Sequence, residues 1–188
     1  MGSVFGMIEE ERKEFDIKRN IFEWVESVVI SVVILAFVFT FLFRIVGVSG
    51  KSMQHTLEDQ DRIVISTLFY TPKYGDIVVV NQPNEFHKPL VKRIIATENQ
   101  TIDIDFETAT VTVDGKVLDE PYLSTPTTDS EGLSFPLTVP EGHVFIMGDN
   151  RQDSTDSRSN LVGMIDTQYI LGRALVRIFP FNKIGLLA

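Results

Sequence analysis

Cysteine is absent from this chain of 188 residues, which excludes disulfide bonds, thiolate catalysis and zinc–cysteine sites. Lysine or arginine clusters are also missing, and the 26 acidic residues outnumber the 17 basic ones. Nucleic-acid binding needs a basic patch that displaces counterions, so a nucleic-acid partner is not expected. The histidines, His55, His87 and His143, are scattered without the spacing of metal ligands. We therefore expect no metal and no cofactor.

A long apolar run near the N-terminus is the strongest feature of the composition. Residues 27–43 read SVVISVVILAFVFTFLF without a charge, and apolar residues resume after Arg44. About 20 apolar residues are enough to cross a hydrocarbon core of roughly 30 Å. Trp24 precedes the run, where an indole suits the membrane interface. The run predicts a transmembrane anchor over residues 27–48.

A buried core helix and a cleavable signal peptide are the two alternatives for this run. A buried core helix is disfavoured because the run is long and apolar on all sides. A cleavable signal peptide is disfavoured because the leader is long and the run exceeds an apolar segment of about 7–15 residues. We expect a retained anchor in the lipid bilayer, with residues 1–26 in the cytoplasm and residues 49–188 exported. The basic residues that precede the run favour this orientation, although by a small margin.

Beyond the anchor, short β-rich segments alternate with turn signals. The expected strands are residues 62–66, 76–80, 90–96, 101–106, 110–113, 116–118, 144–147 and 170–178. Asp114-Gly115 predicts a tight hairpin, and the Ser, Thr and Pro content of residues 122–140 predicts a long surface loop. The expected fold class is mainly β, with one antiparallel domain behind a single N-terminal transmembrane helix.

A serine and a lysine are the candidate reacting groups. Ser52 lies in residues 49–53 (SGKSM), where a turn or cap role is the ordinary interpretation. A serine becomes nucleophilic only when a base takes its proton. Lys92 lies in residues 90–95 (LVKRII), where strand alternation places one of two adjacent cations on the core face. Burial lowers the pKa of a lysine, which makes Lys92 a candidate general base; a lysine that reaches water is the alternative.

Residues 148–158 (GDNRQDSTDSR) form the densest polar cluster of the chain. A solvated turn is the ordinary interpretation. A calcium loop is disfavoured because Ser154 stands where an EF-hand needs glycine and Asn160 where it needs glutamate. The remaining hypothesis is a buried support for an active site, in which Asp156 and Arg158 pair.

A serine–histidine–aspartate triad is the rival catalytic arrangement. His55 follows Ser52 too closely to face it in an extended segment. His87 lies in a polar loop that contains proline, and His143 lies in a turn. The sequence context of these histidines favours the serine–lysine pair over a triad.

In their order and spacing, these segments resemble type I signal peptidases, the serine–lysine enzymes that remove signal peptides from exported proteins. The motif around the nucleophile appears as residues 52–57 (SMQHTL), and the Gly-Asp-Ile-Val strand as residues 75–78. The Lys-Arg motif is residues 92–93, and the Gly-Asp-Asn-Arg motif runs intact over residues 148–158. Each motif alone is weak, but together they cover most of the chain.

The resemblance implies a role for each matched residue. Ser52 would attack the scissile carbonyl, and its backbone N–H would form part of the oxyanion hole. Lys92, when neutral, would take the serine proton and return it to the leaving amine. Ser154 would orient the lysine amine through a hydrogen bond, with Asp156 and Arg158 as a supporting ion pair.

The resemblance also implies the substrate and the location. Signal peptides end in a small-x-small pattern, and shallow apolar pockets near Met53, Leu57, Leu90 and Val91 would select it. An extended peptide would pair with the edge of the strand at residues 90–92. The site would face the outside of a bacterial cell membrane, where tethering raises the effective concentration of substrate.

One position near the nucleophile follows the Gram-positive pattern, and two other positions depart from the family pattern. Gly50 stands where many members have a serine that donates to the oxyanion, as in the Gram-positive pattern, so the second donor is unassigned. His55 replaces a proline, so we expect a looser loop. Gln100 stands in for an aspartate in the turn after Ile95. These departures suggest a specialised member that acts on pilin or other surface-protein precursors.

Two functions compete with a signal peptidase. A non-catalytic assembly or chaperone factor on the same fold would be expected to have lost the serine or the lysine, and this chain keeps Ser52 and Lys92. A self-cleaving serine–lysine repressor would carry a DNA-binding domain in place of the apolar run.

Overall fold

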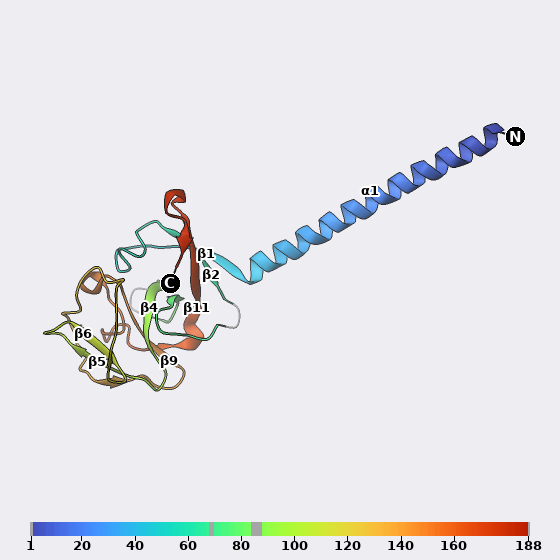
Figure 1. Cartoon of the computed structure of the whole chain (residues 1–188). Coiled ribbons are helices and arrows are strands. Elements are labelled where there is room, and N and C mark those ends of the chain that lie inside the picture. The colour runs from blue at the N-terminus through green and yellow to red at the C-terminus, as the bar shows by residue number, and fades with distance from the viewer. Residues whose placement is uncertain (1, 68–69, 84–87, 188) are drawn as a thin grey trace. The chain divides into compact units, whose positions relative to one another are not determined.

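The computed structural model describes residues 2–67, 70–83 and 88–187, with side chains left undescribed at residues 2–19, 38 and 41 (Figure 1). The chain divides into two compact units, residues 1–41 and residues 42–188. The first unit contains helix α1, Gly2–Phe41. Its segment Asn20–Phe37 has a mean hydropathy of 1.8 and is entirely unburied, so by length and composition it could cross a membrane.

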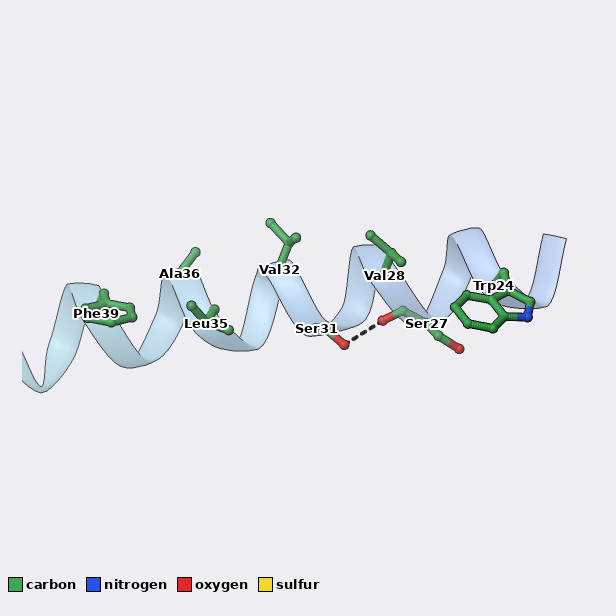
Figure 2. A pocket seen from close by; sticks show the side chains of 8 residues that line it. All are labelled: Trp24, Ser27, Val28, Ser31, Val32, Leu35, Ala36 and Phe39. Atoms are coloured by element: carbon green, nitrogen blue, oxygen red, sulfur yellow. Dashed lines mark hydrogen bonds between the residues drawn. The ribbon is translucent and has the colours of Figure 1, made fainter. Parts of the chain in front are cut away.

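One face of α1 carries a shallow apolar hollow. Its lining consists of Trp24, Ser27, Val28, Ser31, Val32, Leu35, Ala36 and Phe39 (Figure 2). The two serine hydroxyls donate to carbonyls one turn earlier: Ser31 Oγ to Ser27 O at 2.7 Å and Ser27 Oγ to Glu23 O at 2.8 Å. Both hydroxyls are therefore satisfied within the helix, as a lipid environment requires.

The expected anchor, residues 27–48, has to be corrected at its C-terminal end. The helix ends at Phe41, and Phe43–Gly47 forms strand β1. β1 pairs antiparallel with β2, Arg62–Ser66, from Phe43 opposite Ser66 to Gly47 opposite Arg62. β-Branched Ile45 and Val46 suit a strand, and the chain then enters the core at buried Val48.

Two antiparallel sheets make up the second unit. The larger sheet has eight strands in the order β1, β2, β11, β3, β4, β9 and β10, with β12 paired to β11. Its further members are β3 (Ile77–Val80), β4 (Leu90–Thr97), β9 (His143–Met147), β10 (Ile165–Asp166), β11 (Ile170–Phe179) and β12 (Gly185–Leu186). The smaller sheet consists of β7 (Lys116–Val117), β6 (Thr110–Val113), β5 (Thr101–Asp105) and β8 (Leu137–Thr138). Three short 3₁₀ turns cover Arg151–Asp153, Thr167–Tyr169 and Phe181–Lys183.

The mainly β antiparallel fold predicted from the sequence is confirmed, and each expected strand is present within a residue or two of its expected bounds. The hairpin at Asp114-Gly115 has the two positive φ angles, 52° and 74°, of a tight primed turn. In the turn after β4, Gln100 Oε1 accepts a hydrogen bond from Thr97 N at 2.9 Å, so the amide of Gln100 closes this turn.

Strand β4 is buried on both faces. Val91 and Ile95 pack against two separate apolar clusters, and Ile94 packs against a third. Lys92 and Arg93 are only 3% and 2% exposed, so the expectation that just one of them shares the core is wrong. Strand alternation separates core from solvent only when one face of a sheet is open, and this central strand has no open face.

Gly172 of β11 lies close to the backbone of β2, so a substitution there tests how these two strands pack. A Cβ at Gly172 would lie 2.4 Å from Ser66 O, whereas a Cβ at Gly47 would meet nothing within 4 Å. We expect Gly172→Ala to cost about 1–3 kcal/mol of unfolding free energy, because backbone atoms must move. Gly47→Ala is the control and should change stability by less than about 0.5 kcal/mol. Equal melting temperatures for the two variants in thermal unfolding would contradict this packing.

Candidate active site

Ser52 lies in a short loop that is fixed on both sides. Before it, Val48 N donates to Asp61 O at 2.8 Å. After it, Leu57 N donates to Met53 O at 2.8 Å, and both of these side chains are buried. The carbonyl of Ser52 itself accepts a hydrogen bond from the backbone N–H of residue 150 at 3.0 Å. The loop is therefore tied down, although a looser loop was expected from the histidine at position 55.

Lys92 reaches Ser52 from the middle of the large sheet. Its Nζ donates a hydrogen bond to Ser52 Oγ over 2.6 Å. Lys92 lies opposite Val78 of β3, and the next residue, Arg93, lies opposite Met147 of β9, so β3 holds the lysine backbone and β9 holds the strand from Arg93 onward. A neutral amine at this distance can accept the serine proton directly.

The environment of Lys92 favours the neutral amine. Burial lowers its pKa from 10.5 to about 8, because a buried ammonium loses its hydration. The carboxylates of Asp156 and Glu131 oppose this effect and keep the pKa from falling further. A substantial fraction of the lysine is therefore unprotonated at mildly alkaline pH.

Asp156 is the centre of the polar cluster at residues 148–158. Its Oδ2 accepts hydrogen bonds from Gly148 N at 2.9 Å and Ser154 Oγ at 2.7 Å. Its Oδ1 accepts from Arg158 Nε at 2.9 Å, in an ion pair with both side chains fully buried. Both oxygens of this buried carboxylate therefore have hydrogen-bond donors, as a buried polar group requires.

Two further buried arginines extend this cluster. Arg93 pairs with Asp149 through two hydrogen bonds of 2.9 and 2.8 Å and lies 4.0 Å from the ring centroid of Tyr122. Arg151 pairs with Glu120 and donates to the Gly148 carbonyl at 3.0 Å. Sequence patterns do not point to these pairs, because the acidic partners lie 31 and 56 residues away in the chain.

Two cavities meet at Ser52 and Lys92. The smaller, of about 230 Å³, is lined by apolar residues that include Met53, Leu90 and Val91. The larger, of about 680 Å³, is more polar and extends toward residues 129–131 and 151–155. Both include residues 49, 50 and 90, so the candidate reacting pair lies where an apolar and a polar compartment join.

Comparison with known proteins identifies the family. The family model for signal peptidase, peptidase S26, matches residues 21–179. A signal peptidase I of Bacillus licheniformis is 38% identical over 184 residues, which cover 93% of this chain and 97% of the relative. The chain belongs to the signal peptidase family.

A second relative agrees with this assignment, and one solved structure was also compared. Signal peptidase I T of Bacillus subtilis is 37% identical over 172 residues, or 86% of each chain. A crystal structure of a signal peptidase I from Enterococcus faecalis is 27% identical and covers 55% of this chain and 97% of its own, with a TM-score of 0.46.

The contact of Ser154 differs from the one that the family pattern led us to expect. Its hydroxyl donates to Asp156, and within the described residues no hydrogen bond joins Ser154 to Lys92. An ionised carboxylate is a stronger acceptor than an amine, which explains where the hydroxyl proton goes. A Cβ on Gly148 would lie 2.3 Å from Ser154 Oγ and 2.5 Å from Ser52 O, so glycine is required where the two segments meet.

The backbone around Gly50 limits the possible oxyanion donors. Gly50 has a φ of 95°, and its N–H donates to Asp59 Oδ1 at 2.8 Å, so that N–H is already used. Within the described residues, the backbone N–H of Ser52 has no acceptor. It is therefore available for a developing oxyanion.

The prediction that Leu57 lies at a substrate pocket has to be corrected. It is fully buried, packs with Ile63 and Ile65, and is not among the described residues that line either cavity at Ser52. The hydrogen bond from Leu57 N to Met53 O closes a turn that directs Leu57 inward. Of the four residues expected at the substrate pockets, the other three line the smaller cavity.

The rival arrangements find no support in the described part of the chain. His55 lies near Glu58, and His143 Nδ1 bonds the Glu141 carbonyl, so neither histidine contacts Ser52. His87 lies outside the described residues. Among described residues, no group of three or more histidine, aspartate or glutamate side chains could hold a metal ion.

Lys92→Met tests the burial of the amine through stability. The folded pKa of about 8 lies below the ordinary value of 10.5, so below pH 8 the fold carries the full cost of a buried charge. That cost disappears as the pH rises to about 10.5. We expect Lys92→Met to be more stable than the wild type at pH 7, with a difference that shrinks toward pH 10.5 in thermal unfolding. Lys116→Met, at an exposed position of β7, should show no such trend. Parallel pH profiles for the wild type and Lys92→Met would contradict the buried amine.

Proposed function

We propose that the chain is a membrane-bound serine endopeptidase that removes N-terminal signal peptides from exported pre-proteins. Ser52 is the nucleophile and Lys92 the general base. The observation that carries this proposal is the 2.6 Å contact between Ser52 Oγ and a lysine amine that is 3% exposed. Membership of the signal peptidase family and the names of its relatives support the same activity.

The reaction follows from this contact. Ser52 Oγ attacks the scissile carbonyl while Lys92 takes the proton of the Ser52 hydroxyl. The free backbone N–H of Ser52 donates a hydrogen bond to the oxyanion that forms. The tetrahedral intermediate collapses when protonated Lys92 gives its proton to the departing amine. The acyl group then remains on Ser52 as an ester. A water molecule, deprotonated by Lys92, then hydrolyses the ester and restores the serine.

The apolar cavity fits the end of a signal peptide. Its volume of about 230 Å³ suits small side chains beside the scissile bond. Leu90, Val91 and Lys92 pair with β3 along one edge, while the pairing of β4 with β9 begins only at Arg93. The second edge of residues 90–92 is therefore open to an extended peptide, which would add a strand and place its small side chains in the cavity.

The anchor and the client proteins belong to this proposal as well. Helix α1 would span the bacterial cell membrane once, with the N-terminus in the cytoplasm and the catalytic unit outside, as in a Gram-positive cell. The unusual residues His55 and Gln100 suggest pilin or other surface-protein precursors as preferred substrates. Equally efficient cleavage of generic secretory precursors and pilins would contradict that preference. The Ser52–Lys92 contact weighs against a non-catalytic assembly or chaperone factor.

Cleavage of a precursor with an Ala-x-Ala site tests the reacting pair. Ser52→Ala removes the nucleophile and Lys92→Ala removes the base, so each should lower kcat by about 10³-fold or more in assays of the full chain in detergent. Lys116→Ala is the matched control, since it removes a lysine from the exposed strand β7, and it should cleave like the wild type. Undiminished cleavage by Ser52→Ala or Lys92→Ala would rule out the pair.

The pH profile tests the identity of the base. Lys92 must be unprotonated to act, and burial lowers its pKa to about 8. The value of kcat/KM should therefore rise about tenfold per pH unit below this pKa and level off above it. A kcat/KM that instead levels off near pH 6.5, where free histidine titrates, would point to a histidine base.

A further inference from the structure

Glu131 is a carboxylate that lies at the candidate site without belonging to the reacting pair. It comes from the loop between β7 and β8, and its side chain is only 17% exposed. Its Oε1 lies 3.1 Å from Arg158 Nη2. It lines the larger cavity together with Ser52 and Lys92. Glu131 therefore occupies the same compartment as the reacting pair.

The backbone on both sides of Glu131 is fixed to the polar cluster. Asp129 O accepts a hydrogen bond from Arg158 Nη1 at 3.1 Å, and Gly132 forms an isolated antiparallel bridge with Ser159. Arg158 itself is fully buried. The position of the Glu131 carboxylate is thus built into the fold rather than left to a free surface side chain.

The charges around Lys92 are balanced only when the lysine is protonated. Two carboxylates, Asp156 and Glu131, share the cation of Arg158. When Lys92 is neutral this group has one negative charge in excess. When Lys92 takes the serine proton, the group becomes neutral. Fixed charges that stabilise the state formed during proton transfer lower the barrier to that step.

We propose that Glu131 is a positioning residue for the reacting pair: held by Arg158, its carboxylate is the counter-charge of the lysinium that forms when Lys92 takes the proton of Ser52. The inference rests on the proposed function of Ser52 and Lys92, and it assigns to the loop between β7 and β8 a direct electrostatic part in the reaction.

The titration of the two groups is consistent with this coupling. Burial raises the pKa of Glu131 to about 7, and Asp156 and Asp129 act in the same direction while Arg158 opposes them. The negative charge of Glu131 in turn raises the pKa of Lys92 against the effect of burial. Above pH 7 the glutamate is mostly ionised, so its charge is present in the range where Lys92 loses its proton.

Other charged groups near Glu131 define the background of the experiment. The larger cavity is also lined by Lys51, Asp129, Arg151 and Asp153. Arg151 is neutralised by Glu120, which belongs to the same loop as Glu131. Glu120 therefore offers a matched control: it anchors the loop to a buried arginine but is not among the largest contributors to the pKa shift of Lys92.

Glu131→Gln keeps the length of the side chain and an oxygen for Arg158 but removes the charge. We expect the acid limb of the kcat/KM profile to move by about 0.5 pH units or more to lower pH, because Lys92 loses its proton more easily. We also expect the high-pH plateau to fall by about two- to tenfold, because the lysinium loses its counter-charge. Glu120→Gln and the charge-keeping Glu131→Asp should leave the limb in place. A Glu131→Gln plateau that falls without any movement of the limb would show a structural role only and overturn the inference.

A second measurement does not depend on catalysis. The rate of acetylation of Lys92 by acetic anhydride, followed by mass spectrometry of the full chain in detergent, reports the pKa of its amine. Glu131→Gln should shift the midpoint to lower pH by about the same amount as the kinetic limb, and Glu120→Gln should not. Identical midpoints in the wild type and Glu131→Gln would overturn the inference. If cleavage by the wild type did not depend on Ser52, the proposed function would be overturned instead. The acetylation midpoints would still decide whether the charge of Glu131 is coupled to the pKa of Lys92.

Discussion

The contact between the buried Lys92 amine and Ser52 Oγ is the interaction on which the site depends. Burial lowers the pKa of an amine toward neutrality, and Lys92 is buried because β4 is covered on both faces. The same covering orders the backbone, because β3 pairs with Lys92 and β9 pairs from Arg93 onward, so that the lysine side chain reaches Ser52. Burial thus supplies both the chemistry and the geometry.

Burial of an amine also limits which charges can lie beside it. A free carboxylate next to Lys92 would hold its proton and remove the base. The nearby acids instead pair with buried arginines: Asp149 with Arg93, and Asp156 with Arg158. These ion pairs allow polar segments from distant parts of the chain to close around the site, while burial still lowers the pKa of Lys92.

The sequence predicts most of the fold and the candidate site, because both depend on local patterns. Alternation and turn residues located the strands, and motif spacing pointed to Ser52 and Lys92. The end of the anchor was mistaken because residues rich in Ile and Val suit a membrane helix and a strand equally well, and only the pairing with β2 decides between them. The inward packing of Leu57 likewise depends on a turn that the sequence does not specify.

Contacts between distant segments account for the remaining differences. Residues 122–140 have the composition of a solvated loop, yet buried Arg151 bonds Thr127 in this segment and buried Arg158 pairs with Glu131. Spacing along the chain does not reveal such partners. The burial of both Lys92 and Arg93 also follows from the second sheet and from clusters built by residues far away.

A direct titration of Lys92 tests the central claim of a neutral buried base. The full chain, labelled with ¹³C-lysine in detergent, can be followed by NMR over pH, with Lys92→Met to assign the signal. The expected pKa of Lys92 is about 8. A Lys92 pKa at the ordinary value of 10.5 would contradict it, because the amine would then carry its proton whenever Ser52 had to be activated.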